Sequence, residues 1–208
     1  MLYSPQRGVV ILQVPKTGTV AFSKGLRGVC PPVRDMPRHV SANQARSFFG
    51  KEKWAELETV AVVREPVSWL QSWYKYLNSR GRLGSDLTFS SFVEIAATDD
   101  SFNGARLNVR SQFDRLSDGR QKRVIVTRLL CFEQLASEYA SLNSELFGGE
   151  GAPLKKANVS AQKVTEIDSE VQGIVRQHWS RDLAIWQRTR ARANQKYGAA
   201  LAAAESGS

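Results

Sequence analysis

Residues 9–19 of the chain read VVILQVPKTGT, and this stretch decides the fold. The branched apolar run at its start is typical of a buried strand in a parallel sheet. The run breaks at Pro15, and polar residues follow before residues 20–26, whose apolar side chains have helical spacing. A strand, a short polar loop and a helix start offer an anion free backbone N–H groups, a favourable helix dipole and a lysine. A strand that ends in a Pro-Lys turn without any ligand is the alternative interpretation.

The order of residues in this loop separates it from the common nucleotide-binding loop. Gly18 would let the backbone approach an anion closely, because glycine has no side chain. A Walker A loop places its lysine after the last glycine, whereas Lys16 precedes Gly18 here. The sequence also shows no candidate Mg²⁺ ligands, so a nucleotide kinase is disfavoured.

Composition predicts a globular protein with anionic partners. The chain has 208 residues and a formal net charge of +9, which favours anionic ligands without choosing among them. No apolar run approaches the ~20 residues of a membrane span, and the first residues lack a signal-peptide pattern. Cys30 and Cys131 stand apart without metal-site spacing, so we expect free thiols in a cytoplasmic protein and no metal site.

Strands and helices are predicted to alternate along the chain. Further buried strands are expected at residues 59–63 and 123–127. A capping box at Ser41 predicts a helix that ends at Gly50, and Pro66 is placed to open the next helix. The remaining helices are expected at residues 89–97, 106–116, 133–147 and 168–192. This order predicts one α/β domain over residues 1–198, with a mainly parallel sheet flanked by helices and a frayed tail at 199–208.

A second polar motif follows the strand at 59–63. Arg64 comes directly after that strand, and Ser72 lies two helical turns further on. A guanidinium and a hydroxyl so placed can hold one phosphate by charge and hydrogen bonding. Arg64 could instead pair with a neighbouring carboxylate, and Ser72 could be an ordinary surface serine. Parallel sheets bind ligands at the carboxyl ends of their strands, where both motifs are expected.

The two motifs together resemble those of sulfotransferases that use 3′-phosphoadenosine 5′-phosphosulfate (PAPS). PKTGT at 15–19 is similar to the family's 5′-phosphosulfate loop, and VVREP at 62–66, with Ser72 and Tyr74 on the next helix, is similar to its 3′-phosphate motif. Weaker similarity covers HVSA at 39–42, FEQL at 132–135, ANVS at 157–160 and RDL at 181–183. The resemblance implies that the nucleotide is bound by Lys16, Thr17, Gly18, Thr19, Val20, Arg64 and Ser72.

The sequence departs from the family pattern at a few of these positions. Val20 stands where relatives usually have a hydroxyl, so one contact to the 5′-phosphate is lost or passes to backbone N–H groups. Ser68 and Trp69 replace an arginine common after the R-x-P turn, and Glu65 replaces the usual Asp or Asn. These differences bear on donor affinity and acceptor choice more than on the chemistry.

The resemblance implies an in-line transfer of the sulfuryl group to an acceptor hydroxyl or amine, without a metal. Lys16 would neutralise the charge that grows on the leaving phosphate. A general base should take the acceptor's proton, and His39 is our candidate, with a carboxylate as the alternative. His178, within the last predicted helix, is interpreted as structural.

The acceptor cannot be identified from sequence. A saccharide, a small metabolite, a lipid and a peptide tyrosine all remain open. The loop at 151–161, which carries Lys155 and Lys156, is expected to cover the nucleotide. Trp69, Trp73, Tyr74, Arg34 and Arg38 are of types that line acceptor sites.

A non-catalytic basic protein that binds a nucleotide or polyanion is the competing function. The positive charge and the arginine-rich last helix favour it. No recognised nucleic-acid motif is present, so we expect no nucleic-acid partner.

Overall fold

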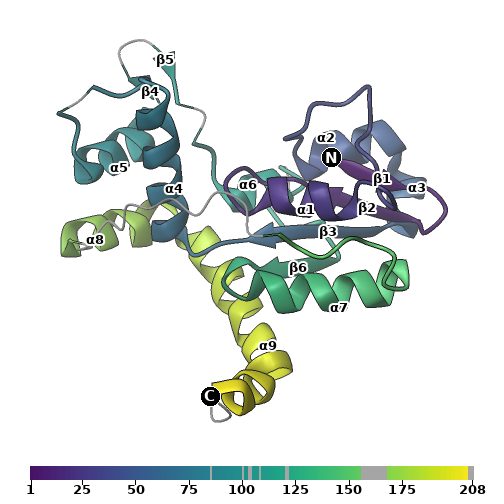
Figure 1. The fold of residues 1–208 in the computed structure, drawn as a ribbon. Helices are drawn as coiled ribbons and strands as arrows, with labels where there is room; N and C mark the ends of the chain where they lie inside the picture. The colour runs from purple at the N-terminus through teal and green to yellow at the C-terminus, as the bar shows by residue number, and fades with distance from the viewer. Residues whose placement is uncertain are drawn as a thin grey trace.

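A computed structural model describes residues 1–84, 86–99, 101–102, 105–107, 109–119, 122–155 and 168–205. Its central feature is a four-stranded sheet in the order β1 (Leu2–Ser4), β2 (Val9–Leu12), β3 (Glu58–Val63) and β6 (Arg128–Cys131). β2, β3 and β6 are parallel, and β1 pairs antiparallel with β2 at the edge. The chain is therefore a single α/β domain with a mostly parallel sheet, as predicted (Figure 1).

Helices cover both faces of the sheet. Val9 and Ile11 of β2 pack toward α1 (Thr19–Leu26) and α7 (Leu135–Phe147). Val10 and Leu12 pack on the opposite face, toward α2 (Ala42–Phe49), α3 (Lys51–Glu56), α6 (Gln112–Leu116) and α9 (Ser180–Glu205). All four side chains of β2 are buried, as expected of a central strand covered on both faces.

A third apolar cluster lies beyond the carboxyl ends of the strands. It joins α4 (Pro66–Ser79), α5 (Phe89–Thr98) and α8 (Ser169–His178) around the fully buried Trp69. Figure 1 shows these helices as a group at the end of β3, next to the hairpin of β4 (Ser101–Phe102) and β5 (Ala105–Arg106). The aromatic stripe of α4 is therefore mostly core. None of the described helices is long and apolar enough to cross a membrane.

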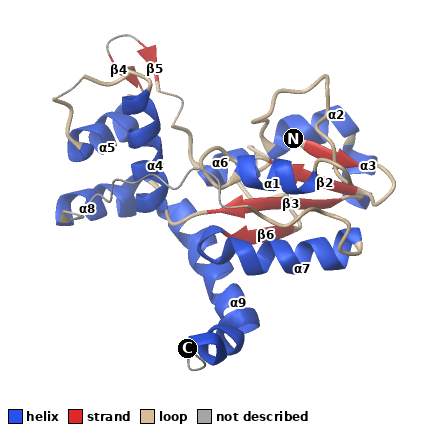
Figure 2. Cartoon of the chain, viewed as in Figure 1, coloured by secondary structure: helices blue, strands red, loops and turns tan. Residues whose placement is uncertain are grey.

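Several elements lie where short local sequence patterns predicted them. β2, α1 and β3 lie where they were predicted, and α2 has the full capping box between Ser41 and Gln44. Pro66 is the first residue of α4, and α7 ends at Phe147, followed by Gly148, whose φ of 60° suits a left-handed helix cap. Figure 2 shows α4 and α7 as continuous helices.

The strand predicted at 123–127 is wrong, because the paired strand is β6, which begins at Arg128. Short apolar segments lie on both sides of Thr127 and Arg128, so hydrophobicity alone could not decide which of them pairs with the sheet. The side chain of Thr127 accepts from the backbone N–H of Thr59 at 2.8 Å, and the ladder with β3 starts only after this side-chain link.

The helix predicted at 106–116 is also wrong over its first half. β5 occupies Ala105–Arg106, and α6 covers only Gln112–Leu116. Ser111 caps α6, and the buried carboxylate of Asp182 accepts from the Gln112 backbone N–H at 2.5 Å and from the Ser111 hydroxyl at 2.6 Å. A partner 70 residues away thus sets the start of α6, which no local pattern could indicate.

The single helix predicted at 168–192 is instead two helices. α8 ends at His178 and α9 starts at Ser180, with Trp179 between them at φ −115° and ψ 29°. Trp179 is buried in the third cluster, whereas Ile185 of α9 packs against the sheet. A single straight helix could not bury residues in both the third cluster and the core against the sheet, so the chain bends at Trp179. α9 runs on to Glu205, while residues 206–208 of the expected tail lie outside the described residues.

We predict that Gly18→Ala destabilises the fold. Gly18 has a φ of 79°, and a Cβ there would lie 2.6 Å from Leu135 Cδ2, so the substitution adds both backbone strain and a clash. We expect a loss of about 1–3 kcal/mol in the free energy of unfolding, measured by urea denaturation.

The matched control is Gly28→Ala. A Cβ added at Gly28 would have no heavy atom within 4 Å, and the φ of Gly28 is not positive, so the extra methyl group meets open space without backbone strain. Equal stability of the two variants would show that Gly18 is not constrained by α7.

Candidate functional site

The loop after β2 is held in an unusual backbone conformation. Lys16 has a φ of 66° and Gly18 one of 79°, and the buried hydroxyl of Thr17 donates to the Val14 carbonyl at 2.8 Å. From the other side, the Trp69 indole N–H donates to the Pro15 carbonyl at 2.9 Å. A left-handed lysine is strained and persists only when its surroundings fix it. These contacts fix the loop and leave the Lys16 side chain half-buried above it.

The loop leads directly into the positive end of a helix. Gly18 is the N-cap of α1, and no described side chain caps this end. The N–H groups in the first turn of an α-helix have no intrahelical acceptor. The start of α1 can therefore donate to an anion.

Arg64 meets this loop from the neighbouring strand. Its guanidinium donates to the Lys16 carbonyl at 3.2 Å and to the Ser68 hydroxyl at 3.0 Å, and it lies over the Phe132 ring at 4.3 Å. Within the described part of the chain it forms no ion pair. The structure thus brings Lys16 and Arg64 together, and the alternative in which Arg64 pairs with a carboxylate does not hold there.

The positive charges of Lys16 and Arg64 repel each other. Burial lowers the pKa of Lys16, and the charge of Arg64 lowers it further. Burial also lowers the pKa of Arg64, although the negative charges of Glu133 and Glu65 raise it in part. An anion bound between them would relieve both penalties.

Ser72 lies on the helix face that meets both cations. Ser68, Ser72 and Tyr76 follow each other at four-residue spacing on α4, so they share one face. Arg64 binds Ser68 at one end of this row, and Lys16 Nζ lies 4.5 Å from the centre of the Tyr76 ring at the other. The half-buried Ser72 hydroxyl has no hydrogen bond to any described residue, so it remains available to a ligand.

Supporting contacts hold the Arg64 turn. The Gln112 side chain accepts from the Arg64 N–H and donates to its carbonyl, both at 2.9 Å. Glu65 caps α4 by accepting from the N–H groups of Val67 and Ser68, and Glu133 accepts from the Glu65 N–H. The departure from the family pattern at Glu65 thus keeps a capping carboxylate, and Glu133 gives the FEQL segment a structural role.

His39 is linked to the same loop through Gln13. Its Nδ1 lies 2.7 Å from the Gln13 carbonyl, and the Gln13 side chain donates to the Ser23 hydroxyl and to the Thr19 carbonyl. Since a carbonyl only accepts, Nδ1 carries the proton and Nε2 is left as an acceptor. Burial lowers the pKa of His39, the hydrogen bond to Gln13 opposes this shift, and the charges of Arg38, Arg115 and the N-terminus lower the pKa further. The neutral form of the ring therefore predominates at pH 7.

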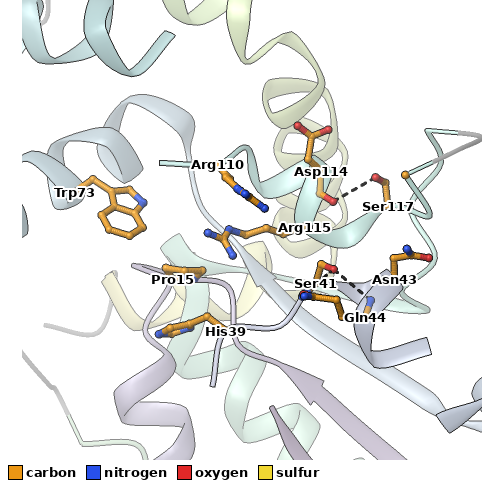
Figure 3. Close-up of a pocket in the computed structure, with 11 residues that line it drawn as sticks. Pro15, His39, Ser41, Asn43, Gln44, Trp73, Arg110, Asp114, Arg115 and Ser117 are labelled. Atoms are coloured by element: carbon orange, nitrogen blue, oxygen red, sulfur yellow. Dashed lines mark hydrogen bonds between the residues drawn. The ribbon is translucent and has the colours of Figure 1, made fainter. Parts of the chain in front are cut away.

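A cavity of about 560 Å³ opens beside His39 and the loop (Figure 3). Its volume is in the usual range for small-molecule sites. It lies between the loop, α2, α4 and α6. The lining residues are Pro15, His39, Ser41, Asn43, Gln44, Trp73, Arg110, Asp114, Arg115, Ser117 and Gly119.

Of the residues that were expected to line an acceptor site, the cavity includes one. Trp73 lines it. Trp69 is fully buried on the loop, and the Tyr74 hydroxyl donates to the Leu87 carbonyl among the aromatic residues of α5. Arg34 and Arg38 are exposed residues outside the lining.

Several site residues were not found from the sequence. Tyr76, Phe132, Gln112, Arg110 and Arg115 reach the site from α4, the start of the segment after β6, and the region around α6. Only the FEQL similarity hinted at one of them, because contacts between segments far apart in the chain leave no local pattern. His178 is exposed on α8 beside Trp179.

Other predictions fall on different parts of the chain. Lys155 is exposed, and residues 156–161 of the loop expected over the nucleotide, including Lys156, lie outside the described residues. Cys30 and Cys131 are free, as expected, and both are buried. The described residues contain no group of three or more His, Cys, Asp or Glu side chains placed to hold a metal ion.

Comparisons with known proteins give little further information. No family model and no curated protein matches the chain. A solved structure, described as a sulfotransferase from Alicyclobacillus acidocaldarius, is similar over 87% of this chain and 94% of its own, with 12% identity and a TM-score of 0.47. A likeness at this level does not assign the chain to a family, so its function has to be inferred from the residues of the site.

Proposed function

We propose that this protein is a sulfotransferase that moves a sulfuryl group from PAPS to an acceptor hydroxyl or amine. The observation that carries the proposal is the meeting of Lys16 and Arg64 at the uncapped start of α1. Two half-buried cations that repel each other, beside free N–H donors, form a site for an anion with more than one charged group. A nucleotide with phosphates at both the 3′ and 5′ positions has that character.

The proposed chemistry is an in-line displacement at sulfur. The acceptor oxygen or nitrogen forms the new bond to sulfur while the bond to the 5′-phosphate oxygen breaks, and the leaving group is adenosine 3′,5′-bisphosphate. Lys16 and the first N–H groups of α1 would stabilise the charge that grows on the leaving oxygen. Arg64 and Ser72 would hold the 3′-phosphate and so fix the position of the donor.

His39 would serve as the general base. Its neutral ring and its protonated Nδ1 leave Nε2 able to accept the proton that the acceptor loses. It lines the cavity together with Pro15, next to Lys16, which is where an acceptor would have to lie.

The competing function, a non-catalytic polyanion binder, has less support. The net charge of +9 favours it, as does the basic end of the last helix. There, Arg192 pairs with Glu138, Lys196 pairs with Glu145 at 2.9 Å, and Arg190 lies over the Trp186 ring. Cations that are already paired within the protein contribute less to a surface for an external polyanion.

The 3′-phosphate should contribute strongly to nucleotide affinity. Adenosine 3′,5′-bisphosphate should bind about tenfold to a hundredfold more tightly than adenosine 5′-phosphate, because Arg64 and Ser72 otherwise lack their anion. Isothermal calorimetry measures both affinities. Ser72→Ala should reduce this preference, whereas Ser79→Ala, at the exposed end of the same helix, should not. Equal affinities for the two nucleotides in the wild type would favour the non-catalytic alternative.

Binding and catalysis can be separated at Lys16. Lys16→Ala should lower kcat by about 10²–10³-fold and weaken bisphosphate binding much less, because the charge that Lys16 meets grows in the transition state. Steady-state kinetics with PAPS and calorimetry give the two quantities. The exposed Lys24 of α1 provides the control, since Lys24→Ala removes the same charge from the far end of the helix. An unchanged kcat with weakened binding would limit Lys16 to a binding role.

The role of His39 as general base can be tested by substitution. His39→Ala should lower the rate by about 10²–10⁴-fold with donor affinity retained. In the wild type, the acidic limb of the pH–rate profile should have an apparent pKa below the ordinary histidine value, because burial lowers the pKa of His39. This limb should disappear in the variant. His178→Ala, which removes the exposed histidine of α8, should change neither property. A His39→Ala protein with normal turnover and an unchanged profile would place the base elsewhere.

A further inference from the structure

The cavity beside His39 contains a buried hydrogen-bond donor that no described residue satisfies. The Trp73 side chain is only 7% exposed, and its indole N–H has no acceptor among the described residues. Leaving a buried donor without a partner is costly. Figure 3 shows the nitrogen-bearing edge of this indole on the side that faces the cavity.

Two guanidinium groups approach the same space. Arg110 and Arg115 line the cavity, and Figure 3 shows both groups directed toward its centre, opposite Trp73 and Pro15. Arg110 is exposed and Arg115 half-buried. The carboxylate of Asp114, which also belongs to the lining, is directed away from them in the same view. The part of the cavity next to Trp73 and Pro15 thus presents N–H donors and positive charge, whereas polar side chains of α2 line another part.

The neighbouring histidine lies in the same positive field. After burial, the charges of Arg38 and Arg115 lower the pKa of His39. A ligand that brings negative charge into the cavity would reduce this repulsion and supply the acceptor that the Trp73 N–H lacks. A neutral ligand could accept a hydrogen bond from Trp73 but would not offset the positive charge of the two guanidinium groups.

We propose that the acceptor is an anionic small molecule whose carboxylate, sulfate or phosphate is held by Arg110, Arg115 and the Trp73 indole N–H. The proposal rests on the proposed sulfotransferase function, because it deepens the account of the same site. The anionic group anchors one end of the acceptor and so presents its hydroxyl or amine to His39. Arg110 is then a specificity-determining residue, and the expectation that Arg34 and Arg38 line this site is replaced by Arg110 and Arg115.

The test is a binding measurement that does not need turnover. The indole N–H resonance of Trp73, assigned by through-bond NMR in ¹⁵N-labelled protein, is followed during titration with sodium D-glucuronate, D-glucose or sodium chloride at matched ionic strength. We expect a saturable shift with glucuronate, binding about tenfold or more weaker for glucose, and no saturable shift with chloride.

Variants of two exposed arginines identify the source of the charge. Arg110→Gln should weaken glucuronate binding about tenfold or more, while Arg34→Gln, which removes the same charge outside the cavity, should leave it within about twofold. Equal binding of glucose and glucuronate, or equal affinities in the two variants, would overturn the proposal.

Addition of adenosine 3′,5′-bisphosphate separates the acceptor from the donor. Glucuronate that stays bound with saturating bisphosphate supports an acceptor site, whereas full displacement would mean that the anion occupies the donor's place and would overturn the proposal. If the proposed sulfotransferase function is wrong, the protein will show no preference for the 3′-phosphorylated nucleotide. That outcome is measured without glucuronate and is therefore distinct from displacement of glucuronate by the bisphosphate.

Discussion

The arrangement of this site depends on the contact between the Arg64 guanidinium and the Lys16 carbonyl. That hydrogen bond joins the turns after β2 and β3 and holds two like charges close together in a half-buried place. Such an arrangement is unfavourable in itself, and the surrounding structure maintains it through Trp69, Gln112 and Glu133. Strain and like-charge proximity of this kind are found at functional sites, where a ligand relieves them.

The sheet and the third helical cluster both contribute to forming the site. The parallel strands bring the two turns to one edge, because their carboxyl ends coincide there. The cluster around Trp69 places α4 across this edge, so that its polar row of Ser68, Ser72 and Tyr76 faces the loop. The same helix directs Trp73 toward the neighbouring cavity. One helix therefore contacts both the proposed donor site and the proposed acceptor site.

The parts of the fold that depend on local chemistry were predictable. The strand at 9–12, the capping box at Ser41 and the proline at the start of α4 each follow from a few adjacent residues. Errors occurred where a distant partner decides, as with Asp182 at the start of α6 and Thr127 before β6. Lys16 and Arg64 could be predicted because each lies in a short local motif. Arg110 and Arg115 could not, because only the tertiary structure brings them to the cavity beside the loop.

The most direct test is a crystal structure of the protein with adenosine 3′,5′-bisphosphate. We predict that the 5′-phosphate lies at the start of α1 with the Lys16 ammonium moved from the Tyr76 ring toward it. The 3′-phosphate should lie within hydrogen-bonding distance of Arg64 and Ser72. A nucleotide bound elsewhere, or one whose phosphates contact neither Lys16 nor Arg64, would contradict the assignment of this site.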